Sequence, residues 1–168
     1  MKALALDALA LAPGECFLEI GFGGGGLLRS ARAAGAEVSG VDVSEAMVRR
    51  ARGLDVHLTG AEALPFGDGT FDAAASLNSL YFWPDPQAAF AEIARVVRPG
   101  GRLVIGFEPA AELRKYGGHV HGFRLFEVAD VRALMEGAGF GEIAERWGRG
   151  RKPDLFCCLS GTRIGANG

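Results

Sequence analysis

The sequence predicts an α/β protein with a Rossmann-like, doubly wound, mostly parallel seven-stranded sheet and a C-terminal antiparallel hairpin. Short apolar segments alternate with helical segments as far as residue 107, which is the pattern of βαβ units. These segments are almost continuously apolar, as are the strands of a sheet covered on both faces. The last two strands are separated only by a short turn that contains Gly, Arg, Lys and Pro, so they must run antiparallel.

Residues that end or begin helices set the boundaries in the first half of the chain. Pro13-Gly14, Gly35 and Gly53 each follow a helical segment, and Ser44 is suited to cap a helix. The expected helices cover residues 3–12, 27–34 and 45–52, and the expected strands cover residues 16–20, 37–42, 56–59 and 71–77.

The second half of the chain continues the alternation of helices and strands as far as residue 107 and then loses it. A helix is expected from the loop at residues 83–86 to Val97, followed by a strand over 102–107. Residues 108–127 have no clean period and are expected to form a short irregular loop on the substrate side. A helix over 128–138 precedes the hairpin strands, at 141–147 and 155–162. Because no linker is visible, residues 1–168 are expected to form a single domain.

Composition and charge exclude several classes of protein. Glycine is abundant, with 26 of 168 residues, but 49% of the chain is hydrophobic and 23% is charged, as in an ordinary globular protein. The net charge of −2 gives no electrostatic support for binding nucleic acid. No apolar run is long enough to span a bilayer. Three cysteines, without metal-ligand spacing, argue against a disulfide framework or a metal site and favour a reducing cytoplasm.

The residues after the first expected strand carry the clearest chemical signal. A turn from Gly21 to Gly26 joins that strand to a helix, so a ligand can approach the main chain and the helix N-terminus. Asp42 ends the next strand, where a carboxylate can accept hydrogen bonds from ribose hydroxyls. Together these features predict an adenosine-type cofactor at the carboxyl ends of the first two strands.

The identity of that cofactor has two readings. Gly21, Gly23 and Gly26 match G-x-G-x-x-G, which leaves a nicotinamide cofactor open. Glu19 favours S-adenosylmethionine instead. A carboxylate at this position would repel a pyrophosphate and attract the ammonium and sulfonium groups of S-adenosylmethionine. The C-terminal hairpin, which stands in place of another βαβ unit, also favours S-adenosylmethionine over a nicotinamide cofactor.

The sequence resembles the class I S-adenosylmethionine-dependent methyltransferases, in particular the small-molecule branch that includes ubiquinone- and menaquinone-biosynthesis enzymes. The resemblance covers nearly the whole chain in the family's order. The stretches that carry it are LEIGFGGG (18–25), VSGVDVSEAMVRRAR (38–52), GAEALPFGDGTFDAAASLNSLYFWPD (60–85), RVVRPGGRLVI (95–105) and MEGAGF (135–140).

The resemblance implies roles for individual residues. Asp42 would hold the ribose, Val43 and Met47 would pack on adenine, and the Ala61 N–H would face the adenine ring. Gly60 stands where the family often has an acid for the adenine amino group, and Glu62 is the available substitute. The full set of implied cofactor-binding residues is Glu19, Gly21, Phe22, Gly23, Asp42, Val43, Met47, Ala61, Glu62 and Asn78.

The implied reaction is in-line transfer of a methyl group to a small-molecule acceptor, and no catalytic residue is assigned. His119, His121 and Tyr116 are candidates for a general base. An NAD-dependent oxidoreductase and a methyltransferase-like binding protein without catalysis remain alternatives. The short segment before Glu19 would leave the site open, and a homodimer is one arrangement that would close it.

Overall fold

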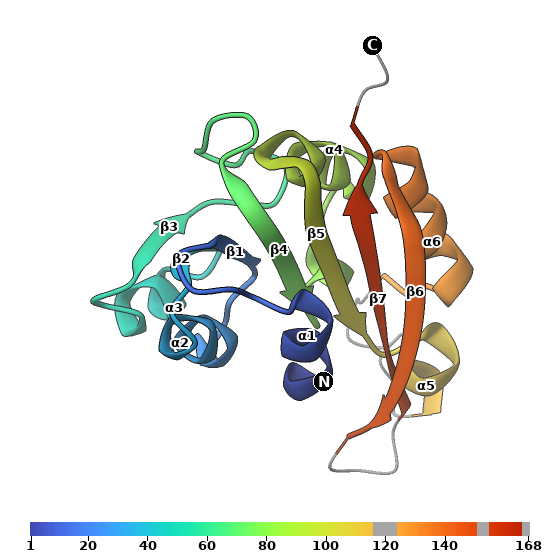
Figure 1. Ribbon diagram of the computed structural model, residues 1–168. Helices are drawn as coiled ribbons and strands as arrows, with labels where there is room; N and C mark the ends of the chain where they lie inside the picture. The colour runs from blue at the N-terminus through green and yellow to red at the C-terminus, as the bar shows by residue number, and fades with distance from the viewer. Residues whose placement is uncertain (116–123, 151–154, 166–168) are drawn as a thin grey trace.

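The computed structural model describes residues 1–115, 124–150 and 155–165 (Figure 1). Its strands form one sheet in the order β3-β2-β1-β4-β5-β7-β6, with β1 to β5 parallel and β7 antiparallel to both of its neighbours. The predicted fold class is therefore confirmed. The strands are β1 Cys16–Ile20, β2 Glu37–Asp42, β3 Asp55–Leu58, β4 Phe71–Leu77, β5 Val97–Phe107, β6 Phe140–Arg149 and β7 Leu155–Arg163.

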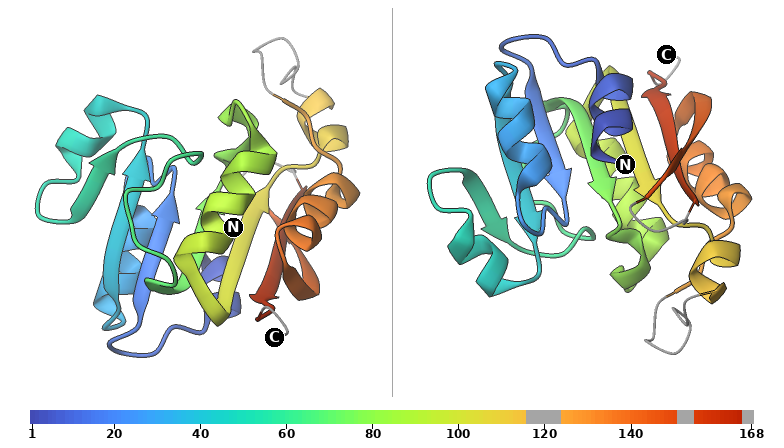
Figure 2. Two further views of the ribbon diagram at one scale, coloured as in Figure 1. Left: turned by 90° about the horizontal axis from the view of Figure 1, so that it is seen from above. Right: turned by 90° about the horizontal axis from the view of Figure 1, so that it is seen from below.

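Helices cover both faces of this sheet (Figure 2). Along β1 and β4, alternate residues point to opposite faces: Phe17 and Ala73 pack with α1 and α2, whereas Leu18 and Ala74 pack with α4 and α6. Burial on both sides explains why these strands read as continuous apolar runs. The helices are α1 Lys2–Leu9, α2 Gly26–Ala33, α3 Glu45–Arg50, the 3₁₀ turn η1 Leu80–Phe82, α4 Pro86–Val96, α5 Ala110–Lys115 and α6 Val128–Gly137.

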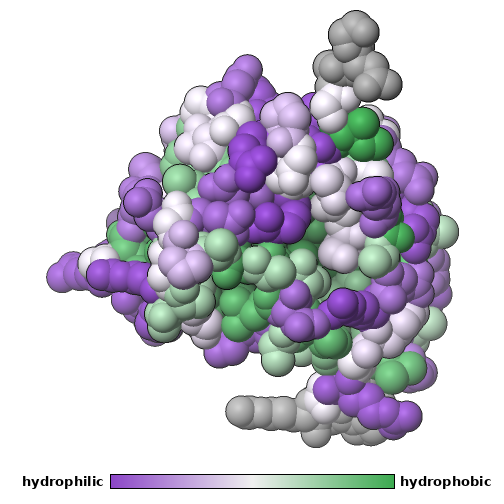
Figure 3. Space-filling model, viewed as in Figure 1, coloured by the Kyte–Doolittle hydropathy of each residue, from purple (hydrophilic) through white to green (hydrophobic). Residues whose placement is uncertain are grey.

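The amino-terminal helix α1 packs across the middle of the sheet. Ala5 and Leu9 are fully buried there, and Asp7 forms an ion pair with Arg146 of β6. Figure 3 shows apolar side chains gathered near the middle of this face, in the region of α1. Among the described residues, no helix is long and apolar enough to cross a membrane.

Three local predictions were wrong. The segment 108–127 contains helix α5, in which Lys115 pairs with the buried Glu112 one turn earlier at 2.6 Å. The Ser44 side chain does not cap α3; its main-chain N–H donates to Asp42 instead. β5 begins at Val97 and not at residue 102 as predicted. Its pairing with β4 continues across a register shift back to the pair of Phe71 and Val97. His119, His121 and Tyr116 lie outside the described residues.

Candidate functional site

A cavity of about 390 Å³ lies at the carboxyl ends of β1, β2 and β4. Open parallel α/β sheets bind ligands at this edge. Residues from four separate segments meet here, and most of those predicted from the sequence are among them. The predicted residues that line the cavity are Gly21, Gly23, Asp42, Val43, Met47, Ala61, Glu62 and Asn78.

The turn between β1 and α2 forms one wall of the cavity. The Gly21 N–H donates to the Val41 carbonyl at 2.8 Å, and both Gly21 and Gly23 have positive φ. A Cβ on Gly21 would overlap with Ser79 Oγ, so this turn lies directly against the segment after β4. Gly23 and Gly24 face open space instead, which leaves the main chain accessible to a ligand.

Asp42 is fixed in place by two backbone donors. Its Oδ2 accepts from the Gly23 N–H and its Oδ1 from the Ser44 N–H, each at 2.8 Å. The side chain is only 9% exposed. A carboxylate has about four acceptor positions, so two remain for a pair of ligand hydroxyls. Asp42 therefore keeps free acceptor capacity at the position where the sequence predicts a ribose site.

Glu19 and Phe22 do not line this cavity. Phe22 is buried in the core, and Glu19, 4% exposed, accepts from the Leu28 N–H of α2 at 3.1 Å. Burial raises the pKa of Glu19 to about 8. Burial therefore favours the neutral form of this carboxyl in the structure, whereas the argument drawn from the sequence took Glu19 as charged.

Replacing Glu19 by Gln is expected to remove a pH dependence of stability. Between pH 5 and 8 the folded protein keeps a proton on Glu19 that the unfolded chain has released. The free energy of unfolding of the wild type should therefore fall, relative to that of the variant, as the pH rises through this window. Urea unfolding of both proteins at pH 5 and at pH 8 measures the effect, and a constant difference would contradict it.

A second, smaller cavity adjoins the first. It has a volume of about 190 Å³ and is bordered by Asn78, Tyr81, Phe82, Glu108 and Leu113. Asn78 and Phe82 border both cavities, so the two meet just after β4. The sequence did not predict this arrangement, because its residues come from η1, the end of β5 and α5.

Tyr81 joins the carboxyl ends of β4 and β5. Its hydroxyl donates to Asn78 Oδ1 at 3.2 Å and accepts from the Glu108 N–H at 2.5 Å. Burial raises the pKa of Tyr81 further above its usual value, so the phenol stays neutral. Tyr81 therefore holds Asn78, a residue with a left-handed backbone, at the junction of the two cavities.

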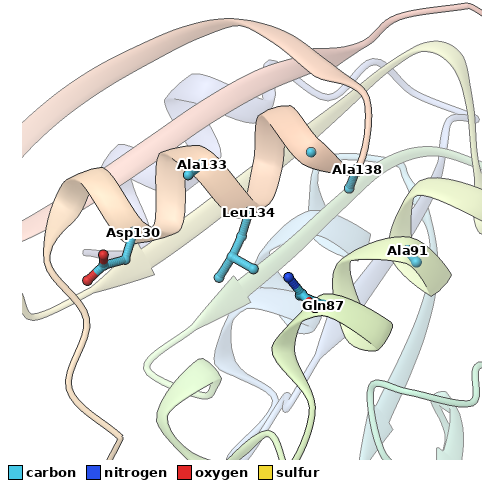
Figure 4. A pocket seen from close by; sticks show the side chains of 7 residues that line it. Gln87, Ala91, Asp130, Ala133, Leu134 and Ala138 are labelled. Atoms are coloured by element: carbon cyan, nitrogen blue, oxygen red, sulfur yellow. The ribbon is translucent and has the colours of Figure 1, made fainter.

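Another cavity, of about 510 Å³, lies between α4 and α6 (Figure 4). Small side chains, such as Ala91 and Ala133, line most of it. Its one carboxylate, Asp130, accepts from the Glu127 N–H and so caps α6. No residue of this cavity belongs to the predicted cofactor set.

The sequence model of a family described as "Methyltransferase domain" matches residues 18–105, just over half of the chain. The chain belongs to this methyltransferase family. The matched region includes every residue that lines the 390 Å³ cavity. The predicted resemblance is thus confirmed, and the nicotinamide reading of the glycine turn is not supported.

Two curated methyltransferases illustrate the relationship. The O-methyltransferase cnsE of Penicillium expansum is 41% identical over 110 residues, which cover 58% of this chain and 39% of that protein. The demethylmenaquinone methyltransferase of Renibacterium salmoninarum is 35% identical over 108 residues, covering 62% of this chain and 46% of that protein. The chain matches less than half the length of either relative.

A solved structure extends the similarity to nearly the whole chain. It is a SAM-dependent methyltransferase from Thermotoga maritima, described as a possible histamine N-methyltransferase. The TM-score is 0.77 at 27% sequence identity, over 96% of this methyltransferase chain and 88% of the other. The cofactor of this family, S-adenosylmethionine, is the one predicted from the sequence.

Proposed function

We propose that this chain transfers the methyl group of S-adenosylmethionine to a small-molecule acceptor by in-line displacement. The observation that carries the proposal is the single cavity in which the glycine turn, Asp42, Val43 and Asn78 meet at the carboxyl edge of the sheet. A nucleoside with an amino-acid side chain matches this lining, because a fixed carboxylate, apolar side chains and an accessible main chain follow one another along the cavity.

Each part of the cavity has a proposed role. Asp42 accepts from the two ribose hydroxyls. Val43, which is 73% exposed, and Met47 offer apolar surface to the adenine ring. Gly21 and Gly23 lie beside the methionine part, and Asn78 lies at its reacting end. When bound, the cofactor supplies a methyl group already activated by its positive sulfur, so the protein chiefly has to align the acceptor with that methyl.

The smaller cavity is the proposed acceptor site. It opens onto the cofactor cavity at Asn78 and Phe82, and about 190 Å³ suits a small molecule. Tyr81 positions Asn78 between the two sites and, as a neutral phenol, does not act as a base. The candidate bases His119, His121 and Tyr116 lie outside the described residues and stay predictions.

A methyl-transfer assay tests this function. The protein is incubated with methyl-labelled S-adenosylmethionine and each member of a panel of quinols, catechols, amines and small acids. We expect at least one acceptor to produce S-adenosylhomocysteine in proportion to the methylated product. Cofactor binding without transfer to any acceptor would instead favour the binding protein without catalysis.

The assembly and the compartment are further proposals. Val43 and Phe82 are exposed at the rim of the cofactor cavity, which supports a second copy of the chain as a cover. A monomer in sedimentation at assay concentration would contradict this.

Cys16, Cys157 and Cys158 are all free thiols, which supports a reducing compartment such as the cytoplasm. Disulfide-linked protein in cell extracts prepared with a thiol-blocking reagent would contradict that assignment.

A further inference from the structure

Among the described residues, every ionisable side chain of Asp, Glu, Lys, Arg or His type that borders the two adjoining cavities is acidic. Asp42 and Glu62 border the cofactor cavity, and Glu108 borders the smaller cavity beside it. Charges interact most strongly where a cavity wall displaces water, so this lining favours a cationic ligand and disfavours an anionic one.

Glu108 lies close to the junction of the two cavities. It directly follows β5, and its side chain is half-buried. The Tyr81 hydroxyl accepts from the Glu108 N–H and donates to Asn78, which borders both cavities. Burial raises the pKa of the Tyr81 phenol and the negative charge of Glu108 raises it further, so the Glu108 carboxylate lies near that hydroxyl.

Two aromatic rings border the smaller cavity together with Glu108. The ring centroids of Tyr81 and Phe82 lie 6.2 Å apart, and the rings are nearly perpendicular, at 86°. Phe82 is 58% exposed and reaches the junction with the cofactor cavity. An ammonium group is attracted to the face of an aromatic ring. A carboxylate and two aromatic rings around a space of about 190 Å³ therefore suit a small amine.

The positive side chains of α5, the helix beside this cavity, each have a carboxylate partner. Lys115 pairs with Glu112 at 2.6 Å, and Arg114 pairs with Glu127 at 3.3 Å. The residue of α5 that borders the cavity is the apolar Leu113. The positive charges of α5 are therefore compensated locally and do not offset the negative charge of Glu108.

We propose that the methyl acceptor is a small amine, held as an ammonium by the Glu108 carboxylate and the rings of Tyr81 and Phe82. The inference rests on the proposed methyl-transfer function and names its class of substrate. Glu108 can serve in this way beside other partners, because a carboxylate has about four acceptor positions and binds a charged N–H donor strongly.

Transfer to an amine is balanced without a further reactant. The ammonium first gives a proton to water, and the nitrogen lone pair then attacks the methyl carbon. A C–N bond forms while the C–S bond breaks, and the electron pair of the C–S bond stays on sulfur in neutral S-adenosylhomocysteine. The positive charge thus moves from sulfur to the methylated nitrogen, where Glu108 stabilises it as it develops.

A panel of matched acceptors tests the assignment. It contains the amine, the alcohol and the carboxylate of the benzyl, 2-phenylethyl and butyl skeletons, and catechol. We expect an amine to have the highest kcat/KM, about tenfold or more above the alcohol and the carboxylate of its skeleton. Faster transfer to an alcohol, a carboxylate or catechol would overturn the inference and leave the methyl-transfer function standing. Binding of S-adenosylhomocysteine without transfer to any acceptor would contradict both.

The variant Glu108→Gln removes the charge and keeps the shape of the side chain. For the best amine, kcat/KM should fall about tenfold to a hundredfold. The affinity for S-adenosylhomocysteine should stay unchanged, because Glu108 does not border the cofactor cavity. Glu136→Gln, on the exposed surface of α6, removes the same charge away from both cavities and should keep the wild-type kcat/KM. A wild-type kcat/KM in Glu108→Gln would overturn the inference.

A second variant covers the case in which Glu108→Gln does not fold. Phe82→Leu changes an exposed side chain and removes one aromatic ring from the cavity. Its kcat/KM for the best amine should fall about twofold to fivefold, while its melting temperature stays close to that of the wild type. An unchanged kcat/KM in Phe82→Leu would contradict the role of the rings in holding an ammonium.

Discussion

Replacing Asp42 by Ala is expected to weaken binding of S-adenosylhomocysteine by about 1–3 kcal/mol, roughly tenfold to a hundredfold. The substitution removes the acceptor for the ribose hydroxyls and leaves the Gly23 and Ser44 N–H groups without their present partner. The glycine turn would then lose its tie to the end of β2. Isothermal titration of both proteins with S-adenosylhomocysteine measures the difference.

The matched control for Asp42 is Asp68→Ala. Asp68 pairs with Arg95 at 2.8 Å on the surface and does not line the cofactor cavity. This control should bind S-adenosylhomocysteine as the wild type does. An Asp42→Ala variant with wild-type affinity would show that the carboxylate does not hold the ribose.

Replacing Gly21 by Ala is expected to destabilise the protein by about 2–5 kcal/mol and to abolish cofactor binding. Two costs add: Gly21 has φ +70, which costs an L-residue about 1–2 kcal/mol, and the new Cβ would overlap with Ser79 Oγ, for which overpacking costs of about 1–3 kcal/mol are typical. Both Gly21 and Ser79 line the cavity, so relief of the overlap would also displace its wall. Thermal melting and titration of the variant measure the two effects.

Gly24→Ala is the matched control within the same turn. Gly24 has no positive φ, and a Cβ there would meet nothing within 4 Å, so this variant should melt close to the wild type. Adding Ser79→Gly to Gly21→Ala should recover part of the lost stability, because it removes the atom that the Cβ would overlap. Equal losses from Gly21→Ala and Gly24→Ala would contradict this account of the turn.

The sequence predicted those parts of the fold and site that depend on the succession and spacing of segments along the chain. The alternation of apolar strands and helices defined the parallel sheet, and the spacing of the glycine turn and Asp42 placed both at one edge. A carboxylate at the end of a second parallel strand must lie near the turn that follows the first. For that reason the sequence could place Asp42 beside the glycine turn, and the hydrogen bonds that Asp42 accepts from the Gly23 and Ser44 N–H groups confirm that position.

What the sequence could not predict depends on packing between distant segments. Burial against α2 and the core raises the pKa of Glu19 and disfavours its charged form, and a sequence does not show that enclosure. The smaller cavity combines η1, the end of β5 and α5, which approach only in the folded chain. Helix α5 itself was missed because its six residues make less than two turns, so its hydrophobic period is too short to recognise.

The central claim is that the cavity beside Asp42 holds S-adenosylmethionine. Calorimetric titration of the wild type with S-adenosylhomocysteine and, separately, with NAD tests it most directly. The account predicts one S-adenosylhomocysteine bound per chain, an affinity roughly tenfold to a hundredfold lower in Asp42→Ala, and no binding of NAD. Binding of NAD without binding of S-adenosylhomocysteine would contradict it.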